Sequence, residues 1–180
     1  MLSQSEIDKY NTVIIRTAVK QGLPERIAKY VASQAEYETG NYTSNNFLKN
    51  NNAFGMAVPK TRKSRYILGA GSVNAPAAEG AFAYARYASI EDSVKDLIDW
   101  FSYNNVDWNT ITSPDSYDAF LVSKGYHTAS QSSYTAGLRA YYDKLKDFVV
   151  RNPKTSIIIG IAGAAMVGTA IYLFVRKKSA

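Results

Sequence analysis

The chain of 180 residues contains no cysteine and a single histidine, His127. The lack of cysteine excludes a disulfide scaffold, a thiolate zinc site and a cysteine nucleophile. One imidazole also excludes a metal site built from several histidines. We therefore expect no metal and no other cofactor, and chemistry that is done by carboxylates, hydroxyls and backbone amides.

Glycine and proline are also scarce, at 11 and 5 residues, whereas hydrophobic residues make up 46% of the chain. A disordered or fibrous chain would show the opposite balance. The length and composition fit one globular domain with its own core and one additional segment.

Charged residues are missing from a long segment near the carboxyl end, residues 156–175. Twenty helical residues span about 30 Å, the thickness of the hydrocarbon core of a bilayer. Basic residues flank the segment, with Arg151 and Lys154 before it and Arg176 after it. We predict a transmembrane helix; a buried core helix is less favoured, because the segment has no polar face.

This segment sets the expected organisation of the chain. We assign a domain to residues 1–148, a linker to 149–155, the transmembrane helix to 156–175 and a basic tail to 176–180. Small residues at positions 160, 164 and 168 share one face of the predicted helix, which suggests that copies of the chain associate through Gly160, Ala164 and Gly168. The first ten residues do not resemble a cleavable secretion signal.

The domain has helical patterns at both ends and an irregular middle. Apolar residues recur at helical spacing over residues 6–21, 24–39, 89–101, 113–124 and 134–148. Ser89 and Ser113 are typical helix N-caps, and Pro114 suits a first helical turn. Residues 41–88 are rich in asparagine and in turn-forming residues, which predicts loops with at most short strands.

Two glutamates near the end of the second predicted helix are candidates for chemistry. At 100° per residue, Glu38 lies about 20° from Ile27 around the helix axis, whereas Glu36 lies about 180° away. We therefore expect Glu38 on the apolar face and Glu36 on the solvated face. A carboxyl group directed toward a core is costly to ionise, which suits a general acid. Glu38 could also be solvated at the frayed helix end.

Four segments of the domain resemble the glucosaminidase family of peptidoglycan hydrolases, glycoside hydrolase family 73. They occur in the order of the family, and each is loosely similar to one of its motifs. The segments are SQAEYETG at residues 33–40, NNAFGM at 51–56, YARYASIEDSVKD at 84–96, and GYHT at 125–128 with Tyr134.

The resemblance implies an α+β, mostly helical, lysozyme-like fold with an irregular middle lobe and a glycan groove. It implies that Glu38 is the acid that protonates the leaving glycosidic oxygen, and it makes Tyr87 a further catalytic candidate. It also implies five substrate-binding residues: Gln34, Asn52, Phe54, Tyr126 and Tyr134. The two asparagines at 51 and 52 could instead serve only to fix a turn.

The chain departs from the family at one position that bears on the mechanism. Relatives can carry a second glutamate in the middle lobe, where this chain has residues 63–66, KSRY. The only acid among residues 41–88 is Glu79, which we take as the candidate second carboxylate. A mechanism with one acid could instead use the 2-acetamido oxygen of the substrate as nucleophile, or release an anhydro sugar as lytic transglycosylases do. The resemblance thus implies either a β-N-acetylglucosaminidase or muramidase type of hydrolase or a lytic transglycosylase.

A basic cluster in the middle lobe does not indicate nucleic acid as a partner. Lys60, Arg62, Lys63 and Arg65 have no interleaved aromatic residues and no recognition-helix pattern. The net charge of +6 also has another origin, because five of the 21 basic residues and none of the 15 acidic ones lie in residues 151–180.

We hypothesise a membrane-anchored glycosidase that cleaves β-1,4 bonds in the glycan strands of peptidoglycan. Its architecture would suit a bacteriophage with an internal membrane, where the protein would act in host-wall penetration; otherwise we expect it in the bacterial inner membrane. The alternative is a non-catalytic, membrane-embedded structural or glycan-binding protein that retains the fold.

Overall fold

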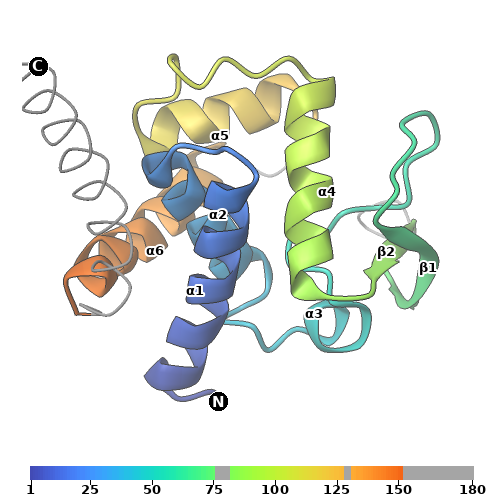
Figure 1. Ribbon diagram of the computed structural model, residues 1–180, viewed down its shortest axis with the longest axis horizontal. Helices are drawn as coiled ribbons and strands as arrows, with labels where there is room; N and C mark the ends of the chain where they lie inside the picture. The colour runs from blue at the N-terminus through green and yellow to red at the C-terminus, as the bar shows by residue number, and fades with distance from the viewer. Residues whose placement is uncertain (76–81, 128–130, 152–180) are drawn as a thin grey trace, which may run out of the picture. The chain divides into compact units, whose positions relative to one another are not determined.

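The computed structural model describes residues 1–75, 82–127 and 131–151 (Figure 1). The chain divides into two compact units, Met1–Asp143 and Lys144–Ala180. The first unit holds nearly all the described elements, and the described part of the second is the end of α6. The elements are α1 Gln4–Lys20, α2 Glu25–Glu38, α3 Asn45–Asn50, β1 Ile67–Asn74, β2 Ala83–Tyr87, α4 Ile90–Tyr103, α5 Pro114–Ser123 and α6 Gln131–Arg151.

Local sequence signals set the ends of most helices. Ser3 and Glu6 form a reciprocal capping box at the start of α1. Ser89 caps α4 by accepting a hydrogen bond from the backbone N–H of Asp92, and Ser113 caps α5, whose first residue is Pro114. The predictions of helix starts at Ser89 and Ser113 are therefore confirmed.

The α2 helix is the centre of the helical core. Its apolar residues Ile27, Val31 and Ala35 have no exposed surface. The α1 helix packs against both α2 and α4, and Figure 1 shows α1 and α2 on one side of α4 and the two strands on the other. Because neighbouring elements cover α2 on more than one face, its carboxyl end is held in a fixed position.

The middle lobe has more regular structure than the sequence predicts. β1 and β2 form an antiparallel pair in which Ala70 faces Ala85, and α3 packs against both strands. Gly71 allows this close approach, because a Cβ atom there would lie 2.3–2.5 Å from atoms of the buried Asn50 side chain. The Asn50 amide oxygen in turn accepts a hydrogen bond from the backbone N–H of Ser72.

The expectation of a mostly helical α+β domain is confirmed, with a sheet of two strands. The α6 helix extends to Arg151, three residues into the expected linker, and the domain boundaries stay predictions. The predicted transmembrane segment, residues 156–175, lies outside the described residues. Within the described ranges, no helix combines the length and the apolar character needed to cross a bilayer.

Candidate active site

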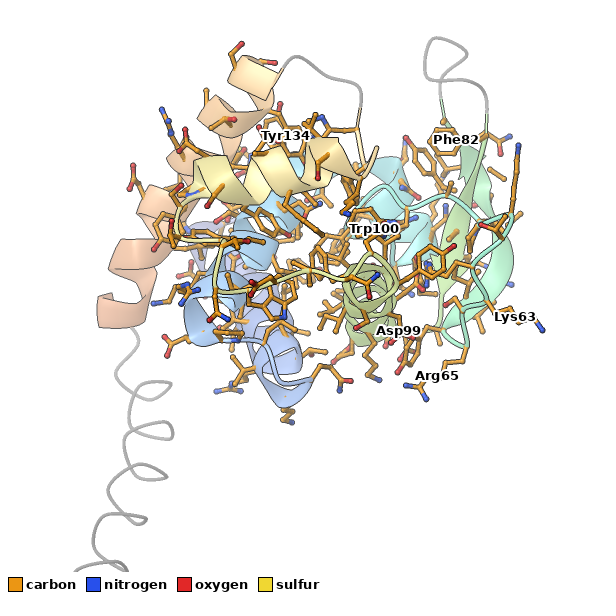
Figure 2. The ribbon with its side chains drawn as sticks, turned by 90° about the horizontal axis from the view of Figure 1, so that it is seen from above. Lys63, Arg65, Phe82, Asp99, Trp100 and Tyr134 are labelled. Carbon is orange, nitrogen blue, oxygen red and sulfur yellow. The ribbon has the colours of Figure 1, made fainter. Side chains whose placement is uncertain are left out.

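Glu38 is the last residue of α2, and its side chain is half-buried. The Tyr134 hydroxyl donates a hydrogen bond to Glu38 Oε1 at 2.5 Å. Tyr134 lies near the start of α6, where Figure 2 labels it. The two residues are 96 positions apart in the sequence, so this contact exists only in the folded domain.

The chain that follows Glu38 turns sharply. Thr39 ends α2, and its hydroxyl donates to the carbonyl of Ala35 at 2.6 Å and accepts from the backbone N–H of Tyr42 at 2.8 Å. Gly40, Asn41 and Tyr42 have φ values of 55°, 59° and 62°. Three successive left-handed residues, one of them a buried tyrosine, are a strained backbone that needs support from its surroundings.

A second loop brings the main chain close to the Glu38 carboxylate. Asn51 ends α3 in the left-handed conformation, with φ of 51°. The Asn52 amide group donates to the carbonyls of Met56 and Ala85 at 2.8 and 2.9 Å, and its oxygen accepts from the N–H of Met56 at 3.1 Å. This turn places Gly55 so that a Cβ atom there would lie 3.6 Å from Glu38 Oε2.

Three tyrosine hydroxyls surround Glu38. Tyr117 donates to Gln34 Oε1 at 2.6 Å, Tyr126 donates to the carbonyl of Phe54, and Tyr134 donates to Glu38. Burial first, and then the charge of Glu38, raise the pKa of all three hydroxyls well above the ordinary value. These hydroxyls therefore keep their protons at neutral pH and act as donors.

This arrangement distinguishes the two oxygens of Glu38. Oε1 accepts a hydrogen bond from the Tyr134 hydroxyl, whereas Oε2 lies on the side of Gly55, 3.6 Å from the position that a Cβ atom of that residue would take. A carboxylic acid with one oxygen fixed by a neutral donor and the other directed at a loop is suited to general acid catalysis.

The structure brings the predicted substrate-binding residues together around Glu38, but most of their side chains are buried. Gln34 is 0% exposed, Asn52 and Phe54 are each 1% exposed and Tyr134 is 3% exposed, whereas Tyr126 is half-buried. In these positions, the four buried side chains support the site and its loop. The interpretation of residues 51–52 as a fixed turn is confirmed by the Asn52 hydrogen bonds, and glycan binding by these residues stays a prediction.

Tyr87, the further catalytic candidate, is buried in the core. It is 2% exposed, and its hydroxyl donates to Asp96 Oδ2 at 2.8 Å. Burial and the Asp96 carboxylate raise the pKa of this hydroxyl. The Arg62 guanidinium binds both oxygens of Asp96, at 2.7 and 3.0 Å. Tyr87 thus supports the core from β2, and a catalytic role for it stays a prediction.

The basic cluster in the middle lobe is only partly exposed to solvent, because Arg62 is buried. Arg62 is 9% exposed and paired with Asp96, whereas Lys63 and Arg65 are exposed and project outward in Figure 2. One of the four basic residues is therefore a core residue.

The prediction for Glu36 is wrong. Glu36 is 2% exposed, and its Oε2 accepts a hydrogen bond from the Asn11 side-chain amide at 2.8 Å. The Tyr42 hydroxyl donates to the Asn11 oxygen at 2.5 Å. The helical periodicity of α2 identified one apolar face correctly but could not show that α1 covers the opposite face.

Other expectations fall outside the site or outside the described residues. Glu79, the candidate second carboxylate, lies outside the described ranges. In residues 1–75, 82–127 and 131–151, no three histidine or acidic side chains are grouped as metal ligands. Tyr117 was not among the predicted site residues; its bond to Gln34, 83 positions away, has no local sequence signal.

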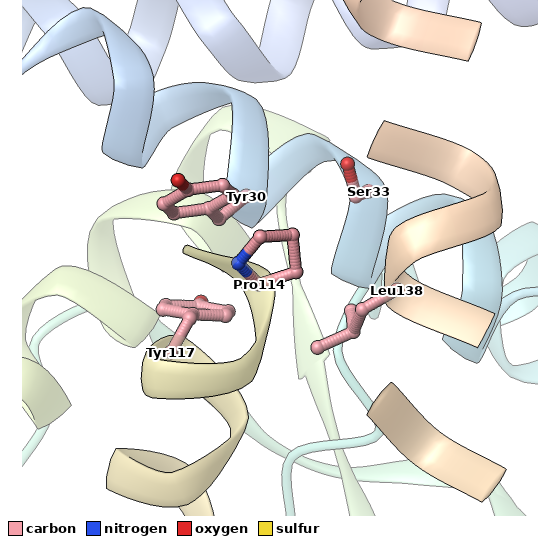
Figure 3. A pocket seen from close by; sticks show the side chains of 5 residues that line it. All are labelled: Tyr30, Ser33, Pro114, Tyr117 and Leu138. Atoms are coloured by element: carbon pink, nitrogen blue, oxygen red, sulfur yellow. The ribbon is translucent and has the colours of Figure 1, made fainter. Parts of the chain in front are cut away.

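A small hollow near the site is too narrow for a glycan. Its empty volume is about 120 Å³, below the roughly 300–1,000 Å³ of typical ligand pockets. Glu38 is not among the residues around it. Figure 3 shows those that line it: Tyr30, Ser33, Pro114, Tyr117 and Leu138.

Two of three comparisons with known proteins find a similar family or structure. The family model Glucosaminidase, described as mannosyl-glycoprotein endo-beta-N-acetylglucosaminidase, matches residues 15–152. Among solved structures, a chain of a type VI secretion system effector–immunity complex from Pseudomonas protegens is similar, with 20% identity and a TM-score of 0.54. The match covers 76% of this chain and 91% of the other, and at this identity it concerns the fold alone. No curated protein sequence matches the chain.

Proposed function

The chain belongs to the glucosaminidase family of glycoside hydrolases, and from this premise we propose that it cleaves β-1,4 glycosidic bonds in the glycan strands of peptidoglycan, with Glu38 as the general acid. The observation that carries the proposal is the hydrogen bond from Tyr134 to Glu38 Oε1, together with the main chain of Gly55 at Oε2. This geometry presents one acidic proton in a defined direction.

The first chemical step uses this proton. The Glu38 carboxyl group donates it to the glycosidic oxygen as the bond between that oxygen and C1 breaks, and the carboxylate that remains is stabilised by the Tyr134 hydroxyl. The positive charge that develops at C1 then needs a nucleophile from the enzyme, the substrate or water.

We propose that the 2-acetamido oxygen of the substrate supplies this nucleophile. A second carboxylate would have to lie about 5 Å away as a nucleophile, or further off to hold a water molecule. Glu79, the candidate second carboxylate, lies outside the described residues, whereas the 2-acetamido group is carried by the substrate itself. The acetamido oxygen bonds to C1, and either water or the 6-hydroxyl of the sugar then displaces it while Glu38 accepts a proton.

The test is digestion of purified cell-wall sacculi with the wild type and with Glu38→Gln, followed by mass spectrometry of the released sugars. The matched control is Glu91→Gln, since Glu91 is an exposed acid on α4. We expect release by the wild type and the control only. Undiminished release by a folded Glu38→Gln variant would overturn the assignment. No release by the wild type would favour a binding protein; reducing ends indicate hydrolysis, and anhydro ends indicate transglycosylation.

We also propose that residues 156–175 anchor the domain in a membrane. The support is the uncharged sequence of this segment and the basic residues on both sides of it. The full chain should float with lipid vesicles in a density gradient, whereas a chain ending at residue 151 should not. Equal flotation of the two chains would overturn the anchor.

Presence of the protein in purified virions would support the phage location, and its presence in bacterial inner membranes alone would contradict it.

A further inference from the structure

Besides Glu38, the Tyr134 side chain contacts His127, which has no role in the proposed chemistry. The imidazole of His127 stacks on this ring with a centroid distance of 3.8 Å and an interplanar angle of 19°. Tyr37 contacts the same ring edge-on, at 5.0 Å and 82°. The Tyr134 ring, which carries the hydroxyl that donates to Glu38, is therefore packed against both His127 and Tyr37.

His127 is itself fixed by a buried carboxylate. Its Nε2 lies 2.8 Å from Oδ1 of Asp118, which has no exposed surface. The Thr135 hydroxyl donates to the other oxygen of Asp118. An ionised carboxylate only accepts hydrogen bonds, so His127 Nε2 carries a proton and donates it.

These contacts tie the ring to two helices. Asp118 belongs to α5, whereas Thr135 follows Tyr134 directly in α6. Within the part of the chain that the structure describes, the His127 Nδ1 atom is buried without a hydrogen-bond partner. The bond to Asp118 is therefore what sets the rotation of the imidazole, and the imidazole face limits the rotation of Tyr134.

We propose that His127 is a positioning residue, which holds the Tyr134 hydroxyl on Glu38 and is held in turn by Asp118. This rests on the proposed role of Glu38 as the general acid. A misplacement of about 1 Å in a catalytic constellation can cost a hundredfold in rate. His127 acts on the bond-breaking step and contributes nothing to glycan affinity.

The experiment compares His127→Leu with His127→Phe. Both variants lose the hydrogen bond to Asp118, but only phenylalanine keeps a flat ring against Tyr134. We expect His127→Leu to lower kcat about tenfold with KM unchanged within about twofold, and His127→Phe to recover most of this loss. Lys124→Ala, at an exposed residue just after α5, is the control for general disturbance of this region.

The same changes are then made in a Tyr134→Phe background. If His127 acts through the Tyr134 hydroxyl, the loss caused by His127→Leu disappears there. A loss of the same factor in both backgrounds, or an unchanged kcat in His127→Leu, would overturn the proposal. If His127→Leu does not fold, His127→Phe supports the same comparison, with a fewfold loss that is expected in the wild-type background alone.

Failure of this proposal is distinguishable from failure of the proposed function. Glu38→Gln is assayed in parallel, and its activity tests the acid directly. An active Glu38→Gln variant overturns the role of Glu38 whatever His127 does. An inactive Glu38→Gln variant together with a fully active His127→Leu variant overturns the positioning role alone.

Discussion

Glu36 and Glu38 are two residues apart on one helix, yet their surroundings differ in kind. Glu36 is enclosed between α2 and α1, and its partner Asn11 is itself bound by Tyr42. Glu38 is half-buried at the helix end, with Tyr134 at one oxygen and Gly55 at the other. Both receive a neutral donor. The difference between the two carboxylates is therefore exposure and not hydrogen bonding, since Glu36 is 2% exposed and Glu38 is half-buried.

The largest expected effect is on the reaction itself. Glu38→Gln should lower the rate of sugar release by about 10²–10⁴-fold, because general acid catalysis contributes that much and an amide has no acidic proton to give. Glu36→Gln keeps an oxygen that accepts from Asn11 and should stay within about threefold of the wild type. Equal losses in the two variants, measured on sacculi, would remove the distinction between the two carboxylates.

Buried tyrosines near both carboxylates should make the folded domain less stable at high pH. Burial raises the pKa of four tyrosine hydroxyls well above 10: Tyr42 beside Glu36, and Tyr117, Tyr126 and Tyr134 near Glu38. Above pH 10 the unfolded chain loses these protons and the folded chain keeps them. The free energy of unfolding should therefore fall by about 1.4 kcal/mol per pH unit for each hydroxyl.

Urea unfolding between about pH 9 and pH 11 measures this slope. A stability that stays constant over this range would contradict the burial of these hydroxyls. Their absorbance at alkaline pH gives an independent check, since the four phenols should ionise only together with unfolding.

Glu36→Ala should act on stability and leave the chemistry intact. Removal of the carboxylate leaves the Asn11 amide buried without its acceptor, which costs about 1–3 kcal/mol in free energy of unfolding. Urea unfolding at neutral pH measures this loss. The activity per folded molecule should remain that of the wild type, and a large drop in kcat would show that the Glu36 surroundings also serve the reaction.

The smallest expected effect is on the donor at Glu38. Tyr134→Phe removes one hydrogen bond to a charged group and should lower kcat about tenfold, which corresponds to about 1.4 kcal/mol. The ring and its packing against His127 are kept, so thermal unfolding should change little. If kcat does not change, the Tyr134 hydroxyl has no part in catalysis.

Much of the helical part could be predicted, because the signals are local. Capping serines, Pro114 and helical spacing of apolar residues act within a few positions of one another. The short α3 helix was missed although Ser44 caps it by accepting from the N–H of Phe47. In β1, Gly69 and Gly71 obscured an eight-residue strand, since glycine is scarce in strands; here Gly71 allows the close approach to α3.

The contacts between distant residues of the site could not be predicted from the sequence. Helical geometry placed Glu38 on the apolar face of its own helix but left a solvated helix end open, and the resemblance to the glucosaminidase family selected it. Its partner Tyr134 lies 96 positions away, and the interaction between Tyr117 and Gln34 spans 83. The error at Glu36 has the same cause, because the burial of a helix face depends on a different helix.

The buried ion pair of Arg62 and Asp96 opposes movement of its segment when substrate binds. Removing one partner from such a pair costs about 3–5 kcal/mol, because it leaves an uncompensated charge in the core. A movement that pulled Arg62 out of its place beside Tyr87 would carry a similar cost. We therefore expect the segment around Arg62 to stay in place when a glycan strand binds, so that at this segment the strand adapts to the enzyme.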